Sequence, residues 1–151
     1  MSCSNSNKNC YAKSCVRYYN NSAQAFTATP TTLAIAGSRV VDSGISIEAD
    51  ASSYTVTKKG LYHISADVEF LATDGLVTFQ AYLDGVALPC TLTRITGVAD
   101  VEKVGHLETD LQFDSCCCNV NHTITFVITG ATGVTGTVNH LCTGVTKLAW
   151  G

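Results

Sequence analysis

A period-two alternation of apolar and polar residues runs through residues 61–71 and is the clearest pattern in the chain. The apolar positions are Tyr62, Ile64, Ala66, Val68 and Phe70, and the polar ones are His63, Ser65, Asp67 and Glu69. Because successive side chains of a β-strand point to opposite faces, this pattern predicts one strand with a buried face and a solvent face. No helical period competes with it along the chain, so we expect an all-β protein.

The same alternation recurs in shorter segments that are separated by turn residues. Further strands are predicted within residues 16–26, 31–36, 45–47, 54–56, 77–83, 91–95, 106–113, 123–128 and 145–150. Asp84-Gly85 lies between two alternating segments and favours a two-residue type I′ hairpin, in which both turn residues take positive φ. Turn signals every 8–12 residues or so are typical of a β-sandwich or jelly roll. The last predicted strand almost reaches the chain end, which favours a central position in its sheet.

Length and composition add a domain count and a reason to expect subunit contacts. The 151 residues fit one domain. Residues 1–17 are polar, rich in Asn, Ser and Cys, and without periodicity, so we expect an N-terminal arm followed by a jelly-roll domain over residues 18–151. Charged residues make up only 14% of the chain, against about a quarter in typical soluble domains. A surface partly hidden in a subunit interface would accommodate so few charges.

Several classes of function are not supported by the sequence. The net charge is −3, and the nine Lys and Arg residues form no basic cluster, so no nucleic-acid partner is expected. No apolar run approaches the ~20 residues of a membrane helix. The first residues contain no hydrophobic segment, and we therefore expect no signal peptide. No pattern resembles a catalytic site, so the expectation is a protein without enzymatic activity, cofactor or bound metal.

Cysteines are the most distinctive residues chemically. The candidates for cross-links are Cys3, Cys10, Cys15, Cys90, Cys116, Cys117, Cys118 and Cys142. Of these, Cys90 and Cys142 are expected to be strand residues. Adjacent cysteines cannot easily bridge one another, because the geometry of a disulfide strains so small a ring. One reading is that the arm is stapled covalently to the 116–118 segment of its own or a neighbouring subunit. The other is a set of free thiols, some buried as small apolar groups. Metal binding is a weaker alternative, since no matched pair of Cys-x-x-Cys motifs is present.

Histidines and carboxylates give two further alternatives. The four histidines are His63, His106, His122 and His140. If a trimer forms, one histidine per subunit at its axis would make a three-nitrogen metal or anion site. Asp67 and Glu69 share one strand face, and Glu108 and Asp110 share another. Neighbouring strands would bring these carboxylates close enough for calcium; the simpler interpretation is a set of solvated strand faces.

One part of the chain resembles a known superfamily. Gly60-Leu61-Tyr62 enters the long alternating strand that ends at Phe70, and a strand with the Asp84-Gly85 hairpin follows. This combination is similar to the tumour necrosis factor/C1q-like (TNF/C1q-like) jelly-roll superfamily over residues 18–150. It is most similar to the bacterial and phage branch, which includes domains of spore-surface collagen-like proteins and phage head-fibre or decoration domains. The Gly-x-y repeat of the collagen-bearing members is absent from this sequence.

The resemblance implies an antiparallel jelly-roll sandwich of ten strands in two sheets, which forms a tight homotrimer around an apolar axis. It also separates the aromatic residues into core positions and trimer-axis positions. The candidates for these two roles are Tyr62, Phe70, Phe79, Tyr82, Phe113, Phe126 and Trp150. Among them Tyr82 is the best candidate for the axis, because it lies on the strand face opposite Phe79.

The sequence therefore favours a structural protein that assembles. The leading hypothesis is a homotrimeric capsid-decoration or head-fibre component on a bacteriophage virion surface, whose arm contacts neighbouring capsid or coat subunits. The first alternative is a structural protein of the bacterial spore surface, the exosporium. The second is a receptor- or glycan-binding module at a fibre tip, which would use the loops between strands.

Overall fold

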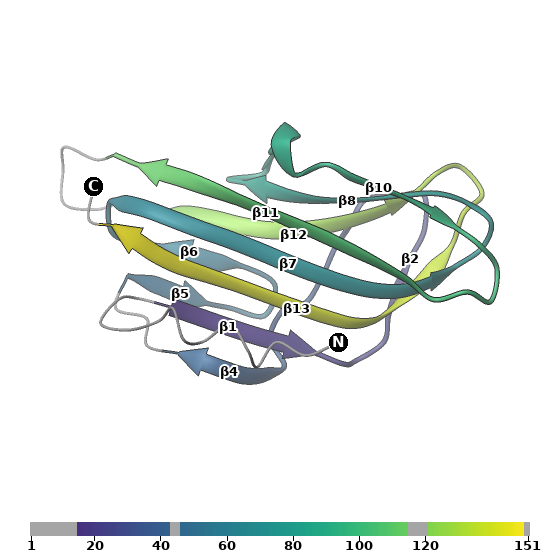
Figure 1. Cartoon of the computed structure of the whole chain (residues 1–151), viewed down its shortest axis with the longest axis horizontal. Helices are drawn as coiled ribbons and strands as arrows, with labels where there is room; N and C mark the ends of the chain where they lie inside the picture. The colour runs from purple at the N-terminus through teal and green to yellow at the C-terminus, as the bar shows by residue number, and fades with distance from the viewer. Residues whose placement is uncertain (1–14, 43–45, 115–120, 150–151) are drawn as a thin grey trace.

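The chain folds into two antiparallel β-sheets packed face to face (Figure 1). The computed structural model describes residues 15–42, 46–114 and 121–149. In this part of the chain the only helical segment is a short 3-10 turn, Pro89–Thr91, and no helix is long and apolar enough to cross a membrane. The expectation of an all-β protein is confirmed.

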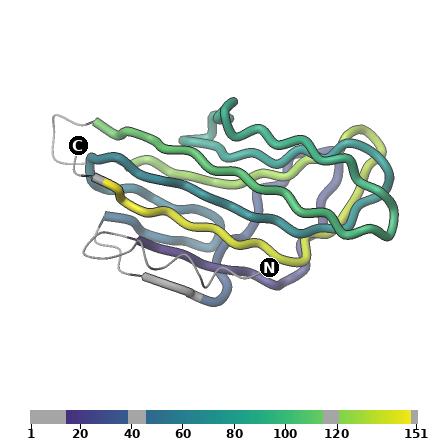
Figure 2. The backbone as a smooth tube through the Cα atoms, in the orientation of Figure 1, coloured from purple at the N-terminus to yellow at the C-terminus, as the bar shows by residue number. Residues whose placement is uncertain are grey.

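One sheet contains six strands and carries both the long predicted strand and the last one. In spatial order it consists of β11 (Lys103–Phe113), β7 (Gly60–Ala72), β13 (Gly136–Ala149), β1 (Cys15–Asn20) and β4 (Ser38–Asp42), and β2 (Gln24–Phe26) also pairs with β13. β13 therefore lies between β7 and β1 in the middle of the sheet, which confirms its predicted central position. Figure 2 shows this arrangement, with yellow β13 between teal β7 and purple β1.

The second sheet contains seven strands. In spatial order it consists of β10 (Thr93–Gly97), β8 (Gly75–Leu83), β12 (His122–Gly130), β6 (Tyr54–Val56) and β5 (Ile47–Ala49); β3 (Thr31–Thr32) also pairs with β12, and β9 (Val86–Ala87) pairs with β8. The main paths of the two sheets together hold ten strands, as the jelly-roll resemblance implied. The short β2, β3 and β9 are additions to these paths.

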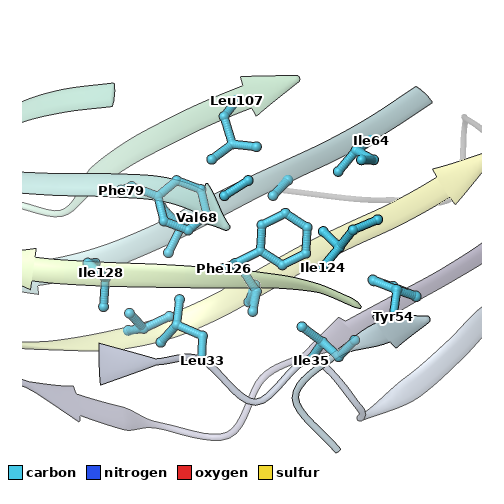
Figure 3. Close-up of a cluster of buried hydrophobic side chains, with 14 of the residues drawn as sticks. Leu33, Ile35, Tyr54, Ile64, Val68, Phe79, Leu107, Ile124, Phe126 and Ile128 are labelled. Atoms are coloured by element: carbon cyan, nitrogen blue, oxygen red, sulfur yellow. The ribbon is translucent and has the colours of Figure 1, made fainter. Parts of the chain in front are cut away.

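The core lies between the two sheets and is built from their inward-facing side chains (Figure 3). Phe126 of β12 is fully buried near its centre. Its ring centroid is 6.4 Å from that of Tyr54 in an edge-on contact and 6.5 Å from that of Phe79 in a stacked one. The Tyr54 hydroxyl reaches across the core to the Thr143 hydroxyl of β13 at 2.7 Å, so this buried polar group is satisfied.

The structure confirms the predicted Asp84-Gly85 hairpin and the predicted long strand. Asp84 and Gly85 have φ values of 51° and 79°, and both are therefore in the left-handed region that a type I′ hairpin requires. The long strand β7 extends one residue beyond each end of the predicted 61–71 segment.

Two expectations need correction. β1 begins at Cys15, so Cys15, Val16 and Arg17 are strand residues rather than part of the arm. The strand predicted within residues 16–26 thus begins one residue earlier, and it is divided in two, because β1 ends at Asn20 and β2 begins at Gln24. Cys90, expected in a strand, lies in the 3-10 turn after Pro89, whose ring supplies no backbone N–H for a sheet.

The connections at one end of the sandwich are joined to one another. Thr73 N donates to Thr135 O at 2.9 Å, and Ala131 N donates to Leu76 O at 2.8 Å. Ala99 N donates to Asp74 Oδ1 at 2.8 Å. These bonds connect the β7–β8, β10–β11 and β12–β13 turns, which lie together at the right of Figure 1. The other ends of β7, β11 and β13 lie together at the opposite end of the sandwich.

Replacement of Phe126 by alanine tests the core. Phe126→Ala removes a fully buried ring that contacts residues on both sides, and we expect a loss of about 3–5 kcal/mol in the free energy of unfolding. Urea unfolding followed by tryptophan fluorescence or circular dichroism measures it. Thr125→Ala, one residue earlier and on the outer side of the same strand, is the control and should cost less than about 1 kcal/mol. Equal losses would contradict this description of the core.

Candidate functional site: a polar face on the six-stranded sheet

The outer side of the six-stranded sheet carries a regular array of polar side chains. Strand pairing aligns four strands, β1, β13, β7 and β11, so that each row across the sheet contains one residue from each. In that strand order the three rows are Tyr19, Cys142, Asp67 and His106; Arg17, Gly144, Ser65 and Glu108; and Cys15, Thr146, His63 and Asp110. We call these twelve residues the polar face. They come from segments that are far apart in the sequence.

Two histidines and three carboxylates of the polar face form a continuous ladder along β7 and β11. His106 Nδ1 is 2.5 Å from Asp67 Oδ1, directly across the strand pair. His63 Nδ1 is 2.6 Å from Asp110 Oδ1, two rows further along the polar face. Glu108 lies between them, with Oε2 3.4 Å from His106 Nε2 and 3.6 Å from His63 Nε2. We refer to these five residues as the histidine–carboxylate ladder.

The ladder is partly open to solvent. Asp67 and His63 are 27% and 34% exposed, whereas the remaining three side chains are about half exposed. Burial lowers the pKa of His106, but the hydrogen bond to Asp67 and the charges of Asp67 and Glu108 outweigh it, so that the pKa lies above its ordinary value. His106 is therefore held in its charged form to a higher pH than a free histidine.

Arg17 is the fixed cation of the polar face, and it is buried. Its side chain lies over Gly144, where a Cβ atom would come within 2.6 Å of Arg17 Nη1. Arg17 Nη2 is 3.9 Å from Cys142 Sγ, and Nε has no hydrogen-bond partner among the described residues. Burial lowers the pKa of Arg17, and the interactions with Tyr54 and Asp67 oppose this only in part.

A hollow opens in the polar face beside the small Ser65 of the middle row. Gly144 and Ser65 separate Arg17 on one side from Glu108 on the other. The hollow has a volume of about 220 Å³ and is lined by Arg17, His63, Ser65, Asp67, His106, Glu108, Thr146 and Leu148. Within the described ranges, no group of three or more His, Cys, Asp or Glu side chains is arranged to hold a metal ion. β7 and β11 are neighbouring strands, as the calcium alternative required, but Asp67 and Asp110 each contact a histidine.

The cysteines separate into two kinds. Cys15 and Cys142 are disulfide-bonded and lie at opposite corners of the β1–β13 half of the polar face, where both are buried. They are opposite Thr146 and Tyr19, hence about 13 Å apart along the strands, too far to be bonded to each other. Cys90 is a free, exposed thiol. The other candidates, Cys3, Cys10, Cys116, Cys117 and Cys118, lie outside the described residues.

The aromatic candidates lie in different places. Tyr62, Phe70, Phe79, Phe113 and Phe126 belong to the buried core. Tyr82 is partly buried on the outer side of the seven-stranded sheet, and Trp150 lies outside the described residues. Arg17 was missed in the sequence, because nothing local to residue 17 shows that a glycine lies opposite it.

Exposed apolar side chains gather next to the polar face, at the end of the sandwich where the turns are joined. Leu71 and Val104 lie on the outer side of the six-stranded sheet, and Val98 and Val101 flank the β10–β11 connection. They are 39–50% exposed. The six-stranded sheet therefore presents a polar array followed by an apolar end.

The sequence alone identifies no relatives for this chain: no protein-family model and no curated protein matches it. Solved structures do match over almost its whole length. Murine APRIL at pH 8.0 aligns with a TM-score of 0.66 and 14% identity, covering 90% of this chain and 99% of that one. PRD1 vertex protein P5 aligns with a TM-score of 0.64 and 12% identity, covering 89% and 96%.

A third match is the globular domain of zebrafish complement 1qA protein, with a TM-score of 0.60 and 11% identity, covering 88% of this chain and 96% of that one. The chain has the TNF/C1q-like jelly-roll fold. The TNF/C1q-like resemblance seen at Gly60-Leu61-Tyr62 is thereby confirmed, and so is the expectation of a phage protein among the relatives in fold.

The Asp67–His106 pair gives a pH prediction. Since the pKa of His106 is raised in the folded state, its contribution to stability is complete below the ordinary histidine value of about 6.5 and is lost as pH rises through the raised value. Asp67→Asn removes the charge and should lower the pKa of His106, as measured by NMR titration of its imidazole protons. Asp84→Asn, which removes the partner of His122 at 2.7 Å in the other sheet, should leave the pKa of His106 unchanged. An unaltered His106 titration in Asp67→Asn would contradict the assignment.

Proposed function

We propose that this chain is a non-enzymatic structural subunit of a bacteriophage virion, present at the particle surface as a homotrimer. The observation that carries the proposal is the shared fold with PRD1 vertex protein P5, which extends over 89% of this chain and 96% of that one. The histidines support a structural role as well. His63, His106 and His122 contact aspartates and His140 contacts Asn21, so these imidazoles are engaged in cross-strand and loop contacts.

The six-stranded sheet offers the surface for assembly. Its outer side carries the polar face followed by Leu71 and Val104, and Val98 and Val101 extend this apolar end onto the β10–β11 connection. In a contact between subunits, the polar array can fix how the two surfaces align, and the apolar patch next to it can supply buried area. The apolar area contributes about 25 cal/mol per Å² when it is removed from water. The aromatic core residues are already buried within one subunit, so the apolar part of the contact is assigned to this end of the sandwich.

The cysteines fasten the assembly in this proposal. Cys15 and Cys142 are disulfide-bonded, not to each other, and Cys90 is free. We therefore assign their partners to Cys3, Cys10 and the 116–118 group, as expected for an arm stapled to the jelly roll of its own or a neighbouring subunit. Cytosolic synthesis and later oxidation on the assembled particle would account for the bonds.

Assembly is tested by the mass of the purified full-length protein in solution. Size-exclusion chromatography with multi-angle light scattering should give three times the mass of one chain at micromolar concentration. Leu71→Glu and Val104→Glu place charges in the apolar end and should shift the protein toward monomers. Val86→Glu, at an exposed apolar residue on the other sheet, is the matched control. A monomer at micromolar concentration would contradict the homotrimer, and absence of the protein from purified particles would contradict the virion assignment.

The staple is tested by cysteine replacement. Cys15→Ser and Cys142→Ser should each lower the free energy of unfolding by about 2–4 kcal/mol under oxidising conditions, whereas Cys90→Ser should have no effect. Gel electrophoresis without reductant then distinguishes the two arrangements: a bond to a neighbouring subunit gives covalent multimers, and a bond within the subunit gives a compact monomer band. Equal stability of all three variants would contradict the proposed stabilisation by disulfides of Cys15 and Cys142.

A further inference from the structure

The polar face carries more negative than fixed positive charge. Its carboxylates are Asp67, Glu108 and Asp110, and its one permanent cation is Arg17. With neutral histidines, three negative charges and one positive charge give the polar face a net charge of −2. Solvent screens this charge while the ladder is exposed. Two protonated histidines would cancel this charge, and the face contains His63 and His106.

Each histidine is already in position to take that role. His106 Nδ1 and His63 Nδ1 are 2.5 and 2.6 Å from their aspartates, and Glu108 Oε2 lies within 3.6 Å of both Nε2 atoms. Protonation would therefore convert both contacts into ion pairs without any movement of the strands. Removal of water from an uncompensated carboxylate is costly, whereas a compensated, hydrogen-bonded pair is tolerated.

We propose that a second copy of this chain covers the polar face, and that His63 and His106 take up protons as it does so, which makes association stronger at lower pH. The inference rests on the homotrimer proposed above and adds its regulation.

Charge complementarity favours a second copy as the occupant. The cation Arg17 is on β1, next to the edge strand β4, and the exposed carboxylates Glu108 and Asp110 are on β11, the edge strand on the other side of the same sheet. A face with one positive side and one negative side is complementary to a rotated copy of itself, and rings of identical subunits are closed by such unlike surfaces. Arg17 is also one of the residues that line the hollow, so a carboxylate of the second copy in the hollow would lie beside its positive charge.

Other charged groups around the two histidines do not replace them. The next row of the sheet brings Glu69, opposite His140 and Val104, so it adds one more carboxylate and one more histidine. Lys147 of β13 and Lys103 of β11 lie on the core side of the sheet, in register with Tyr62 and Phe70. The remaining residues of the polar face on β13 are Cys142, Gly144 and Thr146, which supply no charge.

The size of the effect follows from linkage. Uptake of up to two protons per subunit changes the association constant per subunit by at most about a hundredfold for each pH unit. The change is concentrated near and above the ordinary histidine pKa of about 6.5.

The experiment is sedimentation equilibrium of the full chain at pH 6, 7 and 8 and constant ionic strength. We expect the wild type to associate at least tenfold more tightly per subunit at pH 6 than at pH 8. The double variant His63→Gln/His106→Gln should associate weakly at every pH, with a flat profile. Glu108→Gln reduces the net charge of the polar face from −2 to −1, and it should reduce the slope of the association constant against pH by about half. His122→Gln, which breaks a similar His–Asp pair in the other sheet, should behave as the wild type, and circular dichroism checks that each variant is folded.

Different failures have different meanings. A trimer whose association is equally strong at pH 6 and pH 8, or weaker at pH 6, would overturn the inference and leave the homotrimer intact. A trimer in which diethyl pyrocarbonate modifies His63 and His106 as fast as in the monomer would show another surface in contact, and would also overturn it. A monomer at every pH would overturn the proposed assembly itself.

Discussion

The pairing of β13 with β7 and β1 is the constraint on which the rest of the structure depends. It brings the first described strand, the last one and the long middle strand side by side. Because strand side chains alternate, this register decides at once which residues enter the core and which form the outer face. A shift of one residue along β13 would place Val145 and Leu141 outside and Thr146 and Cys142 inside. The apolar core and the polar face are therefore specified by the same set of backbone hydrogen bonds.

The sequence predicts the parts of this structure that depend on local patterns. Alternation over 61–71 identified β7 and its two faces, and Asp84-Gly85 identified a turn whose two positive φ angles are present. Both signals arise from the conformational preferences of neighbouring residues, which the sequence records directly. The TNF/C1q-like jelly roll could be predicted because its entry motif and its hairpin are also local.

The parts that could not be predicted depend on which strands become neighbours. Asp67 and His106 are on separate predicted strands, and their alternation alone does not show that the two strands pair directly in the register that joins them. Gly144 illustrates the same limit: in the sequence it is a weak strand residue, whereas in the sheet it provides the space that Arg17 occupies. Cys90 was misplaced for the opposite reason, because Pro89 redirects the backbone into a 3-10 turn within an otherwise extended pattern. Pairing and local exceptions are set by the whole fold.

The antiparallel contact between β1 and β13 also gives the body a direction. Cys15, where β1 starts, is opposite Thr146, near the point where β13 ends, so the chain enters and leaves the sandwich at one pole. The hydrogen-bonded turns β7–β8, β10–β11 and β12–β13 occupy the other pole. The start of β1 and the end of β13 therefore lie at the pole opposite the joined turns and the exposed apolar residues Leu71 and Val104. Segments that precede β1 or follow β13 in the chain therefore join the sandwich at the far pole from its apolar end.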